Sequence, residues 1–368
     1  MHLQKLQIIN FRNYEEATFD LQPHVVCLIG PNGCGKTNFL DAIHYLSFTK
    51  GAGPATDAQS VRKTENWFLI KGWFARAGGV QEVACSFQAL KKTVRENDVE
   101  YGRLSEHVGK YPVVMISPQD IELIWDGSEV RRRFFDSLLC QLDRTYLQHL
   151  IAYSGALKQR NAALQLFAQR DTTDFELLAQ YTRQLVTTGT YLHQAREKLV
   201  RNLALHCTVH YQSLSQKPDE IVSIRYRSEA HECALADLFE RSLERDRAVQ
   251  RTTAGIHRDD FVFELAGQEL KRFGSQGQQK SFLIALKMAE FETLATAKGF
   301  KPLLLLDDIF DKLDDQRMER LMQAVAQETF GQIFVTDARP DRSRQITAAL
   351  SYTPQFIDFR STQFPRQR

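Results

Sequence analysis

Short apolar runs and longer stretches with helical spacing alternate along the chain. Residues 24–29 (HVVCLI) form a compact run rich in β-branched residues, which predicts a buried strand. The run stops at Gly30, and apolar positions from 38 to 48 then recur on one helix face. Strand, glycine-rich turn and helix therefore follow one another. Before them, residues 3–9 alternate in part and predict an edge strand.

A β-rich piece is predicted between residues 60 and 101, because strand-like runs are separated there by glycine and polar turns. These runs and one further buried strand candidate cover residues 67–74, 82–87, 92–95 and 113–116. From about 130 to 210 the spacing becomes helical, and no proline interrupts it. Four leucines return to one helix face every second turn: Leu178, Leu185, Leu192 and Leu199.

Strands and helices alternate again toward the carboxyl end. Predicted strands cover 221–226, 260–265, 303–307 and 332–336, and predicted helices cover 277–297 and 315–329. Alternation at both ends, with helices between, predicts an α/β fold in which a parallel core carries an inserted helical lobe. We expect residues 1–120 and 245–368 to form the core domain and 121–244 to form the mainly helical lobe.

Composition excludes several classes of protein. The 368 residues carry 47 Lys+Arg and 45 Asp+Glu, so a bulk basic footprint for nucleic acid is absent. At 43% hydrophobic and 25% charged residues, the chain is not dominated by disorder, and its apolar runs are far short of a membrane span. The six cysteines form no CxxC pair, which argues against a disulfide framework or a zinc site. A reducing cytoplasm is the expected compartment.

The glycine-rich turn matches the phosphate-loop pattern GxxxxGK[ST] in full and lies between a predicted strand and helix. That context disfavours a chance turn. Backbone N–H groups and the helix N-terminus would surround a triphosphate, Lys36 would act on its β- and γ-phosphates, and Thr37 would ligate Mg²⁺. The predicted nucleotide-binding residues here are Gly30, Pro31, Asn32, Gly33, Cys34, Gly35, Lys36, Thr37 and Asn38.

Two acids follow the apolar run Leu303–Leu306, at the end of a strand where ligands bind in open α/β sheets. We expect Asp307 to hold Mg²⁺ through water and Asp308 to polarise the attacking water. Asp308 is one methylene shorter than the glutamate commonly found there. The alternative, a solvated acidic turn, is weaker because the phosphate loop is also present.

Ser275 and Gly277, with Gln278, open the predicted helix at 277–297 and are similar to the signature loop of ABC-type ATPases. In such a loop a hydroxyl and backbone N–H groups contact the γ-phosphate held by the other subunit. Ser-x-Gly before a helix more often means an N-cap serine and a turn glycine. Its position one helix length before the acidic strand favours the signature loop. Residues 310–314 resemble the D-loop that follows.

Together these motifs resemble the ATPase heads of the SMC group and, within it, the RecF family. The segments that carry the likeness span positions 1 to about 340. They are Leu6–Tyr14, Ile116–Ile124, Arg131–Asp136, Leu157–Asn161, Gly255–Asp260 and Ser275–Lys280. The resemblance implies an ABC-type ATPase head, in which a parallel sheet bearing the phosphate loop joins an antiparallel β piece.

The same resemblance implies an ATP-dependent homodimer that binds double- and single-stranded DNA, prefers junctions at gaps, and works with RecO and RecR in loading recombinase. It puts Arg12 and Asn13 near the nucleotide and makes Gln119 a Q-loop residue beside the metal. The chain departs from the family pattern at Ile256, Ser128, Asp311 and Lys312. Thr336 stands where transporter ATPases have the switch histidine, which predicts slow hydrolysis.

The densest basic run is Arg131–Arg133, of which two side chains can face outward while the third is structural. Further candidates for DNA contact are Lys91, Lys92, Lys158 and Arg160. Each could equally belong to a solvated, ion-paired face. Residues 121–200 carry ten Lys/Arg and nine Asp/Glu, so a DNA surface would be assembled by dimerisation. For His257–Asp259 we predict a salt-bridged turn.

Three alternatives use the same motifs. The ATPase subunit of a membrane transporter is opposed by the missing switch histidine and by the lobe of about eighty residues between sheet segments. A nuclease would need a separate metal-binding acid cluster, which the sequence lacks. A coiled-coil SMC fragment would need sustained heptads. The lead hypothesis is a DNA-repair ATPase in which ATP closes a dimer on DNA and hydrolysis reopens it.

Overall fold

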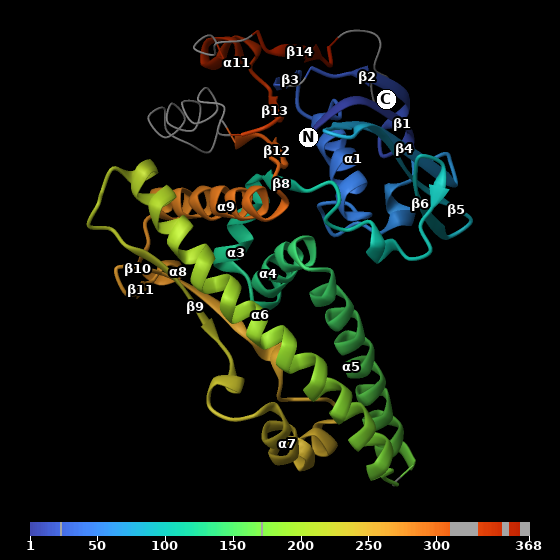
Figure 1. Ribbon diagram of the computed structural model, residues 1–368, viewed down its shortest axis with the longest axis vertical. Helices are drawn as coiled ribbons and strands as arrows, with labels where there is room; N and C mark the ends of the chain where they lie inside the picture. Colours follow the sequence, from blue (N-terminus) through green and yellow to red (C-terminus); the bar gives the residue numbers. More distant parts are fainter. Residues whose placement is uncertain (23, 171, 310–329, 348–352, 361–368) are drawn as a thin grey trace. The chain divides into compact units, whose positions relative to one another are not determined.

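The computed structural model describes residues 1–368 except 23, 171, 310–329, 348–352 and 361–368 (Figure 1). The described chain forms two compact units. The first unit contains Met1–Ile121, His210–Gln216 and Gln276–Arg368, and the second contains Glu122–Val209 and Lys217–Ser275. The assignment of residues 121–244 to a separate lobe stays a prediction. The predicted D-loop at 310–314 and helix at 315–329 lie outside the described residues.

A parallel sheet forms the centre of the first unit. Its order is β14 (Gln355–Asp358), β3 (Val25–Ile29), β13 (Ile333–Asp337), β12 (Leu303–Leu306) and β8 (Val113–Ile116). Every residue of β3, β12 and β13 is buried, which is the expected state of parallel strands covered on both faces. The continuous apolar runs at 24–29, 303–307 and 332–336 therefore predicted these strands correctly.

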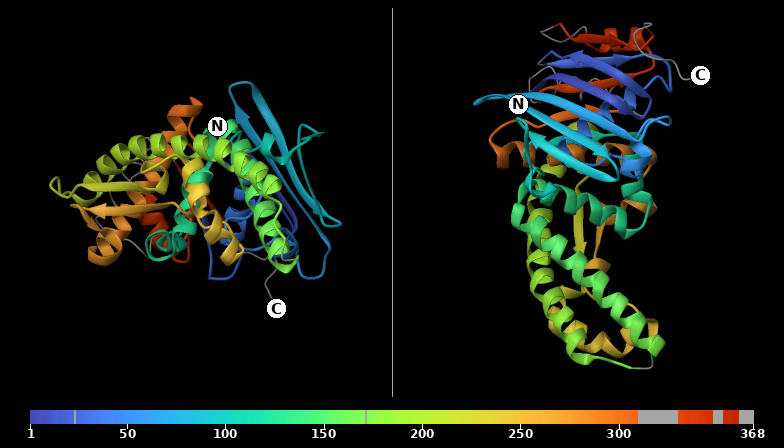
Figure 2. Two further views of the ribbon diagram at one scale, coloured as in Figure 1. Left: turned by 90° about the horizontal axis from the view of Figure 1, so that it is seen from below. Right: turned by 90° about the vertical axis from the view of Figure 1, so that its right-hand side faces the viewer.

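An antiparallel sheet forms a second layer of the same unit. Its order is β2 (Tyr14–Asp20), β1 (His2–Phe11), β4 (Trp67–Arg76), β5 (Gly79–Gln88), β6 (Lys91–Glu96) and β7 (Val99–Glu100). Its blue and cyan strands run side by side in the right-hand view of Figure 2. The predicted edge strand at 3–9 is wrong, because β1 pairs with β2 on one side and β4 on the other. Alternation in a sequence reports which face is buried, and it does not report how many neighbours a strand has.

Helix α1 (Lys36–Phe48) packs between the two sheets, and this burial sets where its first turn lies. Phe39, Leu40 and Ile43 are fully buried in one core cluster with residues of both sheets. The fit is tight at Gly72 of β4, where a Cβ would lie 2.6 Å from Leu46 Cδ1 and 3.0 Å from Leu3 Cδ1, so a larger residue would force these leucines to shift. Because α1 follows β3 directly, the helix N-terminus is held at the carboxyl edge of the parallel sheet.

Helix α9 (Gln276–Lys298) packs against β8 in the first unit. The shorter elements of this unit are α2 (Asp57–Ser60), η1 (Leu104–Glu106), η2 (Pro118–Ile121) and α11 (Pro340–Thr347). Turn η2 follows β8 and also contacts α9.

Long helices dominate the second unit, as the spacing between 130 and 210 predicted. Its helices are α3 (Glu122–Trp125), α4 (Ser128–Leu142), α5 (Arg144–Arg170), α6 (Phe175–Ser215, which continues into the first unit), α7 (Leu235–Val249) and α8 (Leu270–Phe273). A small antiparallel sheet contains β9 (Val222–Arg227), β10 (Asp260–Leu265) and β11 (Gln268–Glu269), with short turns η3 (Glu229–His231) and η4 (Ile256–Arg258). The four leucines predicted on one face of α6 are all buried.

A buried arginine holds parts of the second unit together. Arg196 on α6 forms ion pairs with Asp136 at 2.9 Å and Asp259 at 3.1 Å. Tyr226 also donates a hydrogen bond to Asp259, at 2.5 Å. The salt-bridged turn predicted at 257–259 is therefore confirmed, and its carboxylate faces inward.

The basic run on α4 differs from its prediction. Arg131 pairs with Asp260 at 2.7 Å, and Arg132 donates to the carbonyl of Asp259 at 2.5 Å. Only Arg133 of the three is largely exposed, and it pairs with Glu129. Two of these arginines are therefore structural and one faces outward, the reverse of the expectation, because the Asp260 carboxylate at the start of β10 and the carbonyl of the preceding Asp259 lie beside the helix.

Arg160 is also wrong as a candidate for DNA contact. Its side chain is 0% exposed and pairs with Asp246 at 2.7 Å and with Thr252 at 2.8 Å. Lys92 is paired with Asp57 at 2.8 Å, whereas Lys158 is exposed. In the part of the chain that the structure describes, no helix combines the length and apolar character that a membrane span requires.

Replacing Arg160 tests this ion pair. Arg160→Ala leaves Asp246 buried without its cation, so we expect the free energy of unfolding to fall by about 3–5 kcal/mol. The matched control is Lys158→Ala on the exposed side of the same helix, which should change stability by less than about 0.5 kcal/mol. Urea unfolding of the whole chain, followed by circular dichroism, measures both. Equal effects of the two substitutions would contradict the assignment of Arg160 to a buried, stabilising ion pair with Asp246.

Candidate functional site

The loop between β3 and α1 adopts a backbone that only glycine allows at its last position. Gly35 has φ +108°, and a Cβ there would lie 2.6 Å from Asn13 Nδ2. Tyr14 donates from its hydroxyl to the Gly35 carbonyl at 3.0 Å. The β1–β2 hairpin therefore supports the loop from behind. Pro31, Asn32 and Gly33, at the tip of the loop, are exposed.

Lys36 begins α1 and is 7% exposed. Its ammonium donates to the carbonyl oxygens of Gly30 at 2.7 Å and Pro31 at 2.9 Å. Cys34 Sγ lies 3.9 Å from the same nitrogen. The charge is thus held over the loop by the loop's own backbone, where an incoming phosphate would meet it.

Asp307 is the centre of a hydrogen-bonded cluster at the carboxyl edge of the parallel sheet. Its Oδ1 accepts from Thr37 Oγ1 at 3.0 Å and from Thr336 Oγ1 at 2.9 Å. Burial raises the pKa of the Asp307 carboxyl, and the two hydroxyl donors oppose that shift. Two residues predicted as metal ligands, Thr37 and Asp307, are therefore in direct contact although 270 positions separate them.

Thr336 is a site residue that sequence reasoning did not identify as one. It had been considered only as the residue that stands in place of a switch histidine. Its hydroxyl also accepts from the backbone N–H of Asp308 at 2.8 Å, so it connects both acids. The available signal was its position after the buried run of β13, since β13 and β12 are neighbours in the sheet.

Asp308 has φ +48°, a left-handed conformation that is uncommon outside glycine. This backbone turn separates the two acids: Asp307 is buried and Asp308 is partly exposed. The structure therefore gives consecutive carboxylates two different environments, as the proposed separate roles of metal ligand and catalytic base require.

Arg12 and Asn13 approach the same helix from the β1–β2 turn. Arg12 pairs with Asp41 of α1 at 2.9 Å. Asn13 donates to the Cys34 carbonyl at 3.3 Å and accepts from Asn38 Nδ2 at 2.7 Å. Asn13 and Asn38 therefore brace the phosphate loop, while the Arg12 guanidinium is held by a carboxylate of α1.

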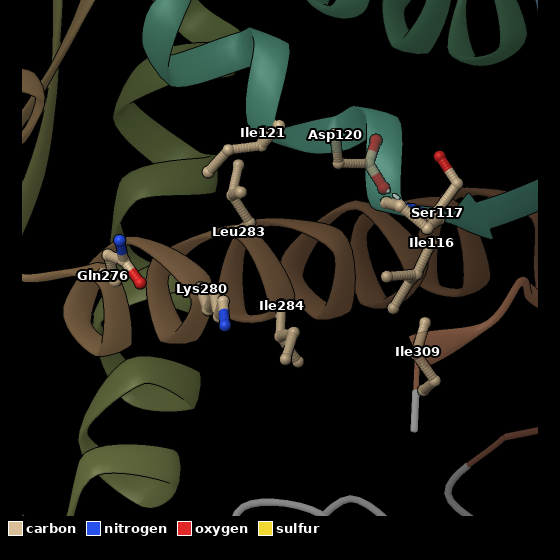
Figure 3. A pocket seen from close by; sticks show the side chains of 10 residues that line it. Ile116, Ser117, Asp120, Ile121, Gln276, Lys280, Leu283, Ile284 and Ile309 are labelled. Atoms are coloured by element: carbon tan, nitrogen blue, oxygen red, sulfur yellow. Dashed lines mark hydrogen bonds between the residues drawn. The ribbon is translucent and has the colours of Figure 1, made fainter. Parts of the chain in front are cut away.

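The remaining predicted residues lie on η2 and α9. Gln119 is exposed on η2, and Ser275 directly precedes α9, whose first turn contains Gly277 and Gln278. A cavity of about 320 Å³ lies between η2 and the start of α9. Figure 3 shows the side chains that line it. Its walls are mainly aliphatic: Ile116, Ile121, Leu283, Ile284 and Ile309.

Within the described residues, no group of three or more His, Cys, Asp or Glu side chains gathers to hold a metal ion. The described residues at this edge of the sheet therefore do not form a metal site made of protein ligands alone. One hydroxyl and one carboxylate are the partial set that Mg²⁺ uses when phosphate oxygens complete its coordination.

Comparison with known proteins identifies relatives along almost the whole chain. A family model described as an AAA domain matches residues 5–329. The DNA replication and repair protein RecF of Flavobacterium johnsoniae is 41% identical over 354 residues, covering 96% of this chain and 98% of that protein. RecF of Cytophaga hutchinsonii is 39% identical and covers 93% and 91% of the two chains.

Solved structures agree with these relatives. A structure described as the recombination mediator protein RecF with ATP in the RecFOR pathway has a TM-score of 0.86, is 26% identical, and matches 92% of each chain. An Smc head domain from Pyrococcus furiosus, with a TM-score of 0.52 at 15% identity, shares the fold. The predicted fold class, an ABC-type ATPase head with a helical region, is confirmed. The transporter alternative has no support from these relatives.

The raised pKa of Asp307 predicts a stability effect with a definite sign. The folded state binds this proton more tightly than the unfolded state, so ionisation of Asp307 weakens folding as pH rises through the raised pKa. Asp307→Asn should therefore raise the melting temperature at neutral pH by roughly 1–2 °C, the shift that about 1 kcal/mol produces in a chain of 368 residues. The gain should vanish below about pH 4, where the carboxyl is protonated in both states.

Differential scanning calorimetry across pH 3–8, without nucleotide, measures this shift. Asp308→Asn is the matched control, since the neighbouring carboxyl is partly exposed and should give a smaller change. A lower melting temperature for Asp307→Asn at neutral pH would show that the buried charge stabilises the fold instead.

Proposed function

The chain belongs to the RecF family of DNA replication and repair proteins, and from that membership we propose that it is an ATPase whose ATP-bound dimer holds DNA at gaps. In this proposal ATP closes the dimer on junctions of double- and single-stranded DNA. Slow, DNA-stimulated hydrolysis then releases it. The protein would act with RecO- and RecR-type partners in loading recombinase, in line with the RecFOR pathway named for the similar structure.

The observation that carries the proposal is the contact between Thr37 and Asp307 at 3.0 Å, directly behind the phosphate loop. It joins the start of α1 to the end of β12, so a hydroxyl and a carboxylate meet where the β- and γ-phosphates would lie. Lys36 lies at the same helix start. The three side chains supply a cation for the phosphates and two oxygen ligands for a metal.

We propose that Thr37 and Asp307, the latter through water, hold Mg²⁺ with the phosphate oxygens, and that Gln119 approaches from η2. Bound there, the ion would neutralise charge shared between the β- and γ-phosphates. Lys36 would bind those phosphates, and residues Gly30–Asn38 would surround them with backbone N–H groups. Arg12 and Asn13 would border the nucleotide from the β1–β2 turn.

Asp308 is our candidate for the group that orients the attacking water. Its partial exposure lets it reach solvent, and Thr336 fixes its backbone N–H. A threonine hydroxyl already engaged with Asp307 and Asp308 cannot replace the histidine that orients a γ-phosphate in transporter ATPases. This arrangement supports slow turnover.

Dimerisation would follow because the groups that bind one nucleotide are divided between two copies of the chain. We propose that Ser275, Gly277 and Gln278, at the start of α9, bind the γ-phosphate of the nucleotide held by the other copy. Nucleotide would then favour the closed dimer because only that state supplies both sets of contacts. Binding to DNA would come from phosphate contacts made by both copies, and it should weaken steeply with salt.

Sedimentation velocity with ATP, with and without gapped DNA, tests the dimer. We expect the wild-type chain to shift from monomer to dimer on adding ATP. Lys36→Met should bind ATP roughly 10–100-fold more weakly, because a charge-assisted contact is lost, and should stay monomeric. Ser275→Arg should bind ATP normally and still fail to dimerise. Tight binding of ATP by a wild-type chain that never self-associates would refute the proposal.

The rate of phosphate release measures ATP hydrolysis, the step that would reopen the dimer. Asp308→Asn should lower kcat by about 100-fold or more, the usual contribution of a group that positions or activates water. Because binding is retained, the ATP-bound dimer should persist longer in this variant. DNA should accelerate the wild-type protein and not Asp308→Asn. A wild-type turnover number like that of a transport ATPase would contradict the role given to Thr336.

A further inference from the structure

A buried ionic cluster in the first unit is formed by residues outside the phosphate loop. Lys287, in the middle of α9, lies between Asp120 on η2 and Glu290 one helical turn further along. Its Nζ is 3.4 Å from Asp120 Oδ1 and 3.2 Å from Glu290 Oε2. The three side chains are only 8–16% exposed. Charges so poorly hydrated are maintained only when each has a partner.

The positive charge of Lys287 stabilises the two buried carboxylates of this cluster. Two nearby carboxylates raise the pKa of Lys287 despite its burial, so the side chain is charged at physiological pH. Burial raises the pKa of Glu290, and Lys287 is the main influence opposing that shift. Loss of the cation would leave two acids near each other in a poorly hydrated site.

Asp120 also connects this cluster to the backbone of turn η2. Its other oxygen, Oδ2, accepts from the backbone N–H of Ser117 at 2.7 Å. The carboxylate therefore closes η2 with one oxygen and binds Lys287 with the other. Gln119, the proposed Q-loop residue, is the preceding residue of the same turn.

Packing between η2 and α9 differs along the helix. Toward the start of α9, the cavity of about 320 Å³ lies between them, lined by Gln276, Lys280 and Leu283 on the helix side. In Figure 3 the Asp120 carboxylate points toward Ser117, while Ile121 and Leu283 face each other across the turn and the helix. The ion pair thus fixes the middle of α9, and the first two turns retain space beside η2.

We infer that Lys287 is a positioning residue that couples the turn carrying Gln119 to the helix that carries the signature loop, so that the two respond together when nucleotide binds. The inference rests on the proposed function, because it concerns how one copy presents Ser275–Gln278 to the nucleotide of the other. Lys287 does not touch the nucleotide in this scheme. Its effect is exerted through the placement of α9 relative to η2.

The test compares substitutions of Lys287 in the full-length protein. Lys287→Met should leave the affinity for a fluorescent ATP analogue within about twofold of wild type, because the phosphate loop is untouched. ATP-dependent dimerisation and kcat should each fall by about tenfold or more, the size of effect expected when a coupled contact is broken. Lys287→Arg, which keeps the charge, should restore most of both.

Two further variants separate positioning from simple stability. Lys287→Met/Glu290→Gln removes the more buried of the two acids that Lys287→Met leaves without their cation, so it should recover most of the melting temperature while dimerisation stays weak. Lys298→Met is the matched control at the end of the same helix, where the described residues provide no carboxylate partner for the lysine, and it should behave as wild type.

The inference fails if Lys287→Met dimerises and hydrolyses ATP like wild type. It also fails if the double variant regains dimerisation together with its melting temperature, since the lysine would then act only on stability. A wild-type chain that shows no ATP-dependent association would instead overturn the proposed function itself. The wild-type measurement therefore distinguishes the two failures.

Discussion

The burial of α1 between two sheets is the constraint on which the rest of the structure depends. Its apolar residues pack against the parallel sheet on one side and the antiparallel sheet on the other, so the helix cannot shift without opening the core. Its N-terminus is consequently held at the carboxyl edge of β3. That edge is where the positive end of the helix, Lys36 and Thr37 meet the acids that follow β12.

This arrangement buries the Asp307 carboxylate, and the loss of its hydration is energetically unfavourable. A carboxylate that is 6% exposed and accepts only hydroxyl donors has lost hydration without gaining a formal cation partner among its described hydrogen bonds. Such a group destabilises the free protein and favours a ligand that brings positive charge. In the proposed function a metal–nucleotide complex would bring that charge, so the burial that is unfavourable without a ligand would favour its binding.

Several charged side chains elsewhere in the chain serve internal structure. Arg160, Arg196 and Lys287 are all buried and paired with carboxylates. The largely buried guanidinium of Arg131 is likewise paired with the carboxylate of Asp260. Buried ion pairs of this kind are sensitive to the loss of one partner, so they define geometry more than they add net stability.

What the sequence by itself determined was many of the local elements and the presence of the phosphate loop; β2, α7 and β14 were not among the predicted elements. Continuous apolar runs, helical spacing and the GxxxxGK[ST] pattern are properties of neighbouring residues, and they predicted β3, α1, β12 and the long helices correctly. Only the tertiary structure decided which side chains meet. Thr336 joined the site, β1 gained a second neighbour, and Arg131, Arg132 and Arg160 turned inward, because strand order and the positions of distant carboxylates decide these contacts, and neither is encoded in local periodicity.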